Sequence, residues 1–216
     1  MEISAIILAG GRSSRMGRNK AMLPLAGVPV IERLIGQLEQ VVGHIVIAGG
    51  NNDTYGHLGV EVVHDVFPEK GPLSGLHAGL TACSTLWSLV VACDMPFADQ
   101  RVFRQIVEST ANAESDQGLD KKGETDKKRT EAIVASVGGR LHPLLGAYRR
   151  SVLPGLSQEL INGNLKMTKW VESLQAEYVD EKILCASTGL PPELLQFNMN
   201  KPDDYLYAKR IFNSEV

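Results

Sequence analysis

A short apolar run that ends in two glycines near the N-terminus is the feature that most constrains the fold. Residues 3–8 (ISAIIL) are rich in β-branched side chains and show no alternation with polar residues. Such a run is typical of a strand buried on both faces, as in a parallel sheet. Gly10 and Gly11 follow it directly, so the strand is expected to run into a tight βα connection.

Similar apolar runs recur along the chain and alternate with segments of helical periodicity. Strands are predicted at residues 3–8, 44–48, 60–63 and 86–93, and helices at residues 29–42, 75–82 and 99–109. This alternation indicates βαβ units with right-handed crossovers. The expected fold class is therefore α/β, a Rossmann-like three-layer αβα arrangement around a mostly parallel central sheet.

The length of 216 residues suits a single domain, residues 1–216. Within it, residues 1–110 form the predicted nucleotide-binding half and residues 131–216 a second half. Residues 111–130 between them have little apolar content and mixed charges, which predicts a mobile polar loop. The second half is expected to contain a strand at 132–137 with a hairpin partner at 145–148, followed by helices at 152–161 and 167–174. A short strand or extended stretch at 196–200 and a C-terminal helix from residue 201 complete it.

Composition excludes several classes of protein. A net charge of -3 does not favour a general nucleic-acid binder. The three cysteines, Cys83, Cys93 and Cys185, form no C-x-x-C pair, which favours reduced thiols over a disulfide framework or a zinc site. No apolar run approaches the roughly 20 residues of a membrane span, and the N-terminus lacks the features of a signal peptide. We therefore expect a cytoplasmic protein with no membrane partner.

The segment after the first strand carries four cations, Arg12, Arg15, Arg18 and Lys20, with no acid between Ala9 and Ala26. A glycine-rich loop between a strand and a helix is typical of phosphate binding, because its backbone N–H groups can face an anion. Neither the Walker motif nor the G-x-G-x-x-G motif matches. A phosphate loop of a different kind is favoured, and a plain turn with surface charges is the alternative.

Two aspartates follow predicted strands. Asp94 comes directly after residues 86–93, and Asp65 after residues 60–63. Ligands of open α/β sheets bind at the carboxyl ends of strands, where an aspartate beside a triphosphate is a natural Mg²⁺ ligand. The turn from Gly71 to Gly75 after Asp65 can offer backbone groups to a base or ribose. The alternatives are a helix cap for Asp94 and an ordinary loop for Asp65.

The chain resembles a known family at several places. The stretch "LAGGRSSRMGRNKAMLPLAGVPVIERL" matches the signature L-A-G-G-x-x-x-R-M-G-x-x-K of a nucleotidyltransferase family position for position. With "DVFPEKGPLSGLHAGL", "VVACDMPF", "LHPLLGAYRRSVLP" and "FNMNKPDDY", the chain is similar to the molybdenum cofactor guanylyltransferases. The resemblance extends from Ile6 to about Tyr205. The polar segment 111–130 departs from it, because it is longer than the resemblance requires.

The resemblance implies a role for individual residues. The backbone at the end of the first strand would hold the nucleotide, and these residues are Leu8, Ala9, Gly10 and Gly11. Arg15 and Lys20 would contact phosphates, Asp65 the guanosine, and Asp94 Mg²⁺, while Gly71 and Gly75 would shape the base pocket. Asn198 and Asn200 would lie on the acceptor side. His142, Tyr148 and Arg149 are further candidates for contact with molybdopterin, and each of these three could instead be structural. Arg12 and Arg18 receive no role.

The implied reaction is transfer of GMP from GTP to the phosphate of molybdopterin, with release of pyrophosphate and with Mg²⁺ as cofactor. Protein partners in molybdenum cofactor assembly are also implied. Alternatives are a cytidylyltransferase, a nucleotidyltransferase acting on a sugar or polyol phosphate, and a non-catalytic GTP-binding protein. A GTPase switch is disfavoured because Lys20 lacks the Walker spacing.

Overall fold

A seven-stranded sheet organises the molecule. The computed structural model describes residues 2–10, 19–49, 52–115 and 129–214. In spatial order the strands are β5 (Glu61–Val63), β4 (His44–Ala48), β1 (Ile3–Leu8), β6 (Trp87–Ala92), β8 (Arg140–Arg149), β7 (Ala132–Val137) and β9 (Ala176–Asp180). The first four are mutually parallel, β8 runs antiparallel to both neighbours, and β7 is parallel to β9. The predicted, mostly parallel α/β sheet is confirmed.

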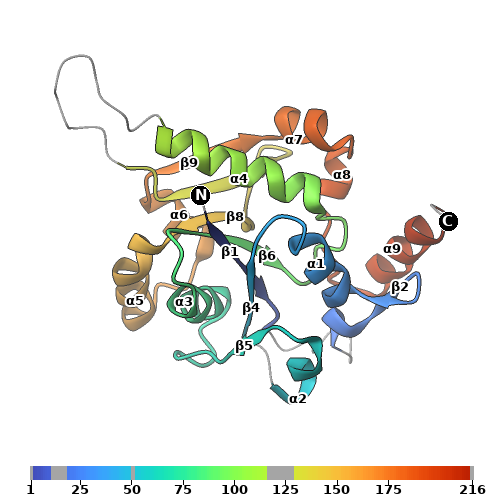
Figure 1. The fold of residues 1–216 in the computed structure, drawn as a ribbon, viewed down its shortest axis with the longest axis horizontal. Coiled ribbons are helices and arrows are strands. Elements are labelled where there is room, and N and C mark those ends of the chain that lie inside the picture. The colour runs from blue at the N-terminus through green and yellow to red at the C-terminus, as the bar shows by residue number, and fades with distance from the viewer. Residues whose placement is uncertain (1, 11–18, 50–51, 116–128, 215–216) are drawn as a thin grey trace.

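Helices cover both faces of this sheet (Figure 1). One face packs against α1 (Val30–Leu38), α4 (Gln100–Ser115) and α7 (Glu181–Thr188), and the other against α3 (Pro72–Ala82), α5 (Leu153–Asn162) and α6 (Met167–Ser173). Strand β1 supplies both cores, because Ala5 and Ile7 face one layer while Ile6 and Leu8 face the other. This is the three-layer arrangement expected from a strand with no polar face.

Shorter elements complete the described chain. They are the 3₁₀ turns η1 (Lys20–Met22), η2 (Gly56–Leu58) and η3 (Arg150–Val152), the strands β2 (Pro24–Leu25) and β3 (Val28–Pro29), and the helices α2 (Asn52–Tyr55), α8 (Pro192–Leu195) and α9 (Pro202–Ser214). Strands β2 and β3 pair as a small antiparallel hairpin beside α9 (Figure 1). The Tyr205 hydroxyl on α9 donates to the Pro24 carbonyl at 2.9 Å. Among the described residues, no helix is long and apolar enough to cross a membrane.

The first predicted helix is shorter than its apolar periodicity suggests. Pro29 ends β3 in an extended conformation (ψ 142°) and stands just before α1, which begins at Val30 and ends at Leu38. The prediction of a helix from Pro29 to Val42 is therefore wrong at both ends. Val42 nevertheless remains buried, which explains why it continues the apolar pattern.

Helix α4 corrects the predicted start of the polar loop at residue 111. It continues to Ser115 because Glu114, in its last turn, accepts a hydrogen bond from the Trp87 indole at 2.9 Å and pairs with Arg149. Both partners come from distant strands. A polar sequence alone does not reveal such contacts, and the rest of the expected loop, residues 116–128, lies outside the described residues.

The second half contains the predicted hairpin, with β8 longer than expected. The helices at 152–161 and 167–174 are confirmed as α5 and α6. Strand β9 and helices α7 and α8 are elements that the sequence pattern does not reveal. The stretch 196–200 has no regular strand pairing, but the Met199 N–H donates to the Asp94 carbonyl at 2.9 Å. That bond ties the end of the chain to the end of β6.

Candidate active site

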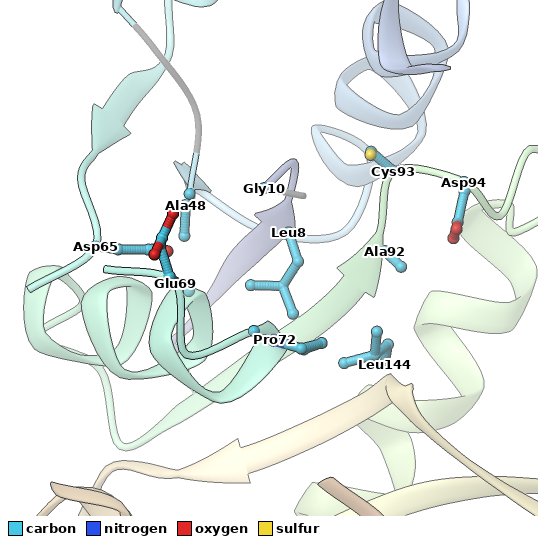
Figure 2. Close-up of a pocket in the computed structure, with 13 residues that line it drawn as sticks. Leu8, Gly10, Ala48, Asp65, Glu69, Pro72, Ala92, Cys93, Asp94 and Leu144 are labelled. Carbon is cyan, nitrogen blue, oxygen red and sulfur yellow. The ribbon is translucent and has the colours of Figure 1, made fainter. Parts of the chain in front are cut away.

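A cavity of about 730 Å³ lies at the carboxyl ends of the central parallel strands. This volume is in the range of small-molecule sites. Thirteen residues from separate segments line it: Leu8, Gly10, Ala48, Gly49, Asp65, Glu69, Gly71, Pro72, Gly75, Ala92, Cys93, Asp94 and Leu144. Figure 2 shows Asp65 and Glu69 at one end, Asp94 at the other, and Leu8, Pro72 and Leu144 between them.

Strands β1, β4 and β6 end together beneath this cavity. The Ala9 N–H donates to the Ala48 carbonyl at 2.9 Å, and the Cys93 N–H donates to the Leu8 carbonyl at 3.0 Å. Three chain segments therefore turn away from the sheet at one level. Open α/β sheets bind ligands at this position.

Two glycines allow the connections after β1 and β4 to touch. A Cβ on Gly10 would lie 3.0 Å from the Gly49 carbonyl oxygen, and a Cβ on Gly49 would lie 2.9 Å from the Gly10 Cα. Gly49 also has a φ of +75°, a backbone angle that residues with a side chain rarely adopt. This close approach explains why position 10 requires glycine, and the contact of Gly10 with a nucleotide stays a prediction. Gly11 lies outside the described residues.

The first turn of α3 forms the wall of the cavity between its two ends. Gly71 precedes the helix with φ 69°, Pro72 begins it, and Gly75 faces β1. A Cβ on Gly75 would lie 3.1 Å from the Leu8 side chain. The predicted pocket-shaping residues Gly71 and Gly75 are thus brought to the cavity, at the N-terminus of α3.

Asp65 lies at one end of the cavity with an unsatisfied acceptor. Its Oδ1 is buried and has no hydrogen-bond partner among the described residues. Burial raises the pKa of this carboxyl, while Ser74 acts in the opposite direction. Glu69 faces the same end (Figure 2) and has an unusual φ of 62° for a residue with a side chain. A donor on a ligand would complement the unsatisfied Oδ1 of Asp65.

Asp94 and Lys20 meet at the other end. The Lys20 amino group lies 3.9 Å from Asp94 Oδ2, and the two side chains are only 16% and 25% exposed. Burial raises the pKa of Asp94, and the charge of Lys20 lowers it in part. An adjacent cation and anion, both partly desolvated, form a site where charge on a phosphate ligand interacts strongly.

Asn200 is the third member of this group. Lys20 Nζ donates to Asn200 Oδ1 at 3.1 Å. The backbone N–H groups of Asn200 and Lys201 both donate to the Asp204 carboxylate at 2.7 Å, which orders the turn before α9. Asn198 does not join the group, because its side-chain amide donates to the Gln196 carbonyl at 2.8 Å.

Two predicted acceptor contacts are wrong. Tyr148 is fully buried, donates its hydroxyl to the Pro143 carbonyl at 2.7 Å and stacks on Trp170. Arg149 is 3% exposed, pairs with Glu114 and lies over the Trp87 ring. Both side chains are buried and bonded in the interior, so their role is structural, which was the alternative to contact with molybdopterin.

His142 is only partly buried, and it does not line the cavity. Burial lowers its pKa, and Nε2 lies 3.4 Å from the Val137 carbonyl oxygen. Its contact with an acceptor stays a prediction. Arg12, Arg15 and Arg18 lie outside the described residues, so the role predicted for Arg15 is not tested.

Several lining residues were missed by sequence reasoning. Ala48 and Gly49 end the strand at 44–48, and the rule that ligands bind at strand ends could have found them. Cys93 lies beside Asp94 and is partly exposed. Desolvation by its surroundings raises the pKa of its thiol to about 12, so it is no ready nucleophile. Leu144 comes from the middle of β8 and carries no local signal of a site.

The residues present fit a magnesium ion shared with phosphate. No group of three or more metal-binding side chains occurs among the described residues. Mg²⁺ commonly takes one or two protein carboxylates and completes its shell with phosphate oxygens and water. Asp94, a single partly buried carboxylate on the cavity wall, matches that pattern.

The fold and the site define an α/β nucleotidyltransferase. The model of one protein family, described as the MobA-like NTP transferase domain, matches residues 5–178. The chain belongs to this family. Nucleotidyltransferases of this kind typically use a divalent metal ion.

Curated relatives carry a more specific name. A probable molybdenum cofactor guanylyltransferase of Pelotomaculum thermopropionicum is 32% identical over 97% of this chain and 93% of its own. A molybdenum cofactor guanylyltransferase of Yersinia pestis is 33% identical over 82% of this chain and 84% of its own. Among solved structures, molybdopterin-guanine dinucleotide biosynthesis protein A from Archaeoglobus fulgidus has a TM-score of 0.78 and 23% identity, covering 99% of this chain and 100% of that one.

Proposed function

We propose that this protein transfers GMP from GTP to the terminal phosphate of molybdopterin and releases pyrophosphate. The observation that carries the proposal is the cluster of Lys20, Asp94 and Asn200. Asp94 lines one end of the cavity, and Lys20 and Asn200 are not among the lining residues. The names of the curated relatives support the choice of substrates. Residues 1–110 would bind the nucleotide and residues 131–216 would supply the acceptor side.

The cavity suggests an orientation for GTP. The guanine edge carries N–H donors and would lie at the Asp65 end, where a buried carboxylate oxygen lacks a partner among the described residues. The triphosphate would extend to Lys20 and Asp94, with the backbone at Leu8, Ala9 and Gly10 along its path. Gly11 keeps its predicted place beside the nucleotide, and Arg15 keeps its predicted phosphate contact, as parts of this proposal.

Asp94 would hold Mg²⁺ together with phosphate oxygens. Magnesium bound there would supply neutralisation of charge on the triphosphate. Lys20 would donate hydrogen bonds to the phosphate oxygens on which charge grows in the transition state. Asn200 orients the Lys20 amino group and would face the acceptor, while Asn198 would act only after releasing its bond within its own loop.

The chemical step needs no general base. A phosphate monoester is largely ionised near neutral pH, because its second pKa is about 6. An oxygen of the molybdopterin phosphate would form a bond to the α-phosphorus, and the bond from that phosphorus to the bridging oxygen would break. The electron pair of the broken bond leaves with pyrophosphate. Catalysis would then rest on positioning and on charge neutralisation.

Pyrophosphate release tests the proposal directly. The purified protein would be incubated with Mg²⁺, molybdopterin and each nucleoside triphosphate in turn. Released pyrophosphate would be measured, and the dinucleotide product would be identified by mass spectrometry. We expect turnover with GTP. Preference for CTP would overturn the guanylyl assignment, and GTP binding without turnover on molybdopterin or on sugar and polyol phosphates would favour a non-catalytic protein. A cytoplasmic location and partner proteins in cofactor assembly remain parts of the proposal.

A further inference from the structure

The residue before Lys20 is held by a buried tyrosine. Asn19 Nδ2 donates to the Tyr55 hydroxyl oxygen at 2.8 Å, and Asn19 Oδ1 accepts from the Ala21 N–H at 3.1 Å. Asn19 thus caps the η1 turn that carries Lys20 and links this turn to the end of α2, 36 residues further on.

Tyr55 is placed to act through Asn19 and not on a ligand. It is 2% exposed and is absent from the lining of the cavity. Burial raises the pKa of its phenol and the hydrogen bond with Asn19 lowers it only in part, so the hydroxyl stays neutral. Its one side-chain partner among the described residues is Asn19.

The connection matters because lysine is a flexible cation. Its ammonium sits at the end of four methylene groups, and its position depends on where the backbone places the side chain. At its far end, Lys20 is held by Asn200 at 3.1 Å. At its near end, the Asn19–Tyr55 bond fixes the turn against the segment that follows β4.

We propose that Tyr55 is a positioning residue that acts through Asn19 to hold Lys20 toward Asp94. The identity of the phosphate ligand rests on the proposed function, but the connection itself does not. Loss of one such neutral hydrogen bond is expected to weaken phosphate binding and turnover roughly three- to tenfold.

A double-mutant cycle tests the proposal. Tyr55→Phe removes the hydroxyl, and Asn19→Ser keeps a side chain that can cap Ala21 but cannot reach Tyr55. Each variant should lower kcat/KM for GTP and weaken binding of inorganic tripolyphosphate with Mg²⁺, measured by calorimetry. The double variant should be no worse than either single variant, because both remove the same interaction.

Two further variants separate positioning from a general loss of packing. In a Lys20→Ala background, Tyr55→Phe should have no further effect on tripolyphosphate binding. Tyr148→Phe is the matched control, since it removes another buried phenol hydroxyl, bonded to Pro143 at 2.7 Å, away from Lys20. It should lower thermal stability while leaving binding and turnover unchanged.

The outcomes distinguish this proposal from the proposed function. If the wild type transfers no nucleotide, the proposed function fails while the tripolyphosphate measurements still decide the role of Tyr55. Three results would each overturn the positioning role. They are additive effects of the two substitutions in the cycle, an undiminished effect of Tyr55→Phe on binding in the Lys20→Ala background, and unchanged binding and turnover in Asn19→Ser. Absence of tripolyphosphate binding by the wild type would overturn it as well.

Discussion

Lys20 and Asn200 are 180 residues apart in the chain and are joined by a 3.1 Å hydrogen bond. The bond connects the turn after the glycine-rich loop to the segment before the last helix. Asp94 lies beside the same amino group, at 3.9 Å. One cation is therefore shared by residues from both halves of the chain, which makes this cluster the first target for substitution.

Replacing either charged member of the cluster should abolish most activity. Lys20→Ala and Asp94→Ala should each lower kcat by about 10²–10³-fold, or ~3–4 kcal/mol, as for the loss of one preorganised contact to a transition state. Steady-state pyrophosphate release measures this, with circular dichroism to show that the fold is intact. Full Mg²⁺-dependent activity in Asp94→Ala would contradict the metal assignment.

Asp94 should make the stability of the ligand-free protein depend on pH. Burial raises its pKa in the folded state, so the folded protein holds this proton more tightly than the unfolded chain does. The stabilising effect is complete below the ordinary aspartate pKa of 3.8 and is lost as pH rises through the raised value. Asp94→Asn should therefore match the wild type in acid and exceed it in stability at neutral pH, as measured by urea unfolding. Equal curves at every pH would contradict the shift.

Gly79 should tolerate no side chain. A Cβ there would lie 2.5 Å from Ile6 Cγ2, where α3 packs on β1. Gly79→Ala should lower the free energy of unfolding by about 1–3 kcal/mol, the usual cost of overpacking a core. The control is Gly36→Ala in α1, where nothing lies within 4 Å of the new Cβ. This exposed helical position should gain about 0.5–1 kcal/mol in the same denaturation assay.

Arg149 should matter for folding and not for the acceptor. Its guanidinium donates to the Thr130 carbonyl at 3.0 Å and pairs with Glu114. Arg149→Met should lower the melting temperature, because it leaves Glu114 without its partner. KM for molybdopterin should stay within about twofold, since the buried Arg149 side chain does not line the cavity. A large increase in that KM at an intact melting temperature would restore the acceptor role.

Strong local patterns predicted most of the central sheet and its flanking helices. Residues 3–8 and 86–93 are continuous apolar runs, and no other arrangement buries them on both sides as well as a parallel sheet does. The two main failures have different causes. Helix α4 extends beyond its apolar pattern because Trp87 and Arg149, distant in the chain, bind Glu114 in its last turn. Strand β9 lies at the sheet edge with mostly exposed side chains, so its sequence has too little apolar content to be recognised.

The order of residues along the chain was enough to specify the fold class, the glycine-rich connection and the aspartates at strand ends, because each depends on neighbours within a few positions. Only the assembled fold decided the position of the Lys20 cation and the burial of Tyr148 and Arg149. It also left Asp65 Oδ1 without a hydrogen-bond partner among the residues that the structure describes. These features depend on contacts between segments as far apart as Lys20 and Asn200. Which side chain faces a cavity and which enters the core is set by that packing, and no local pattern encodes it.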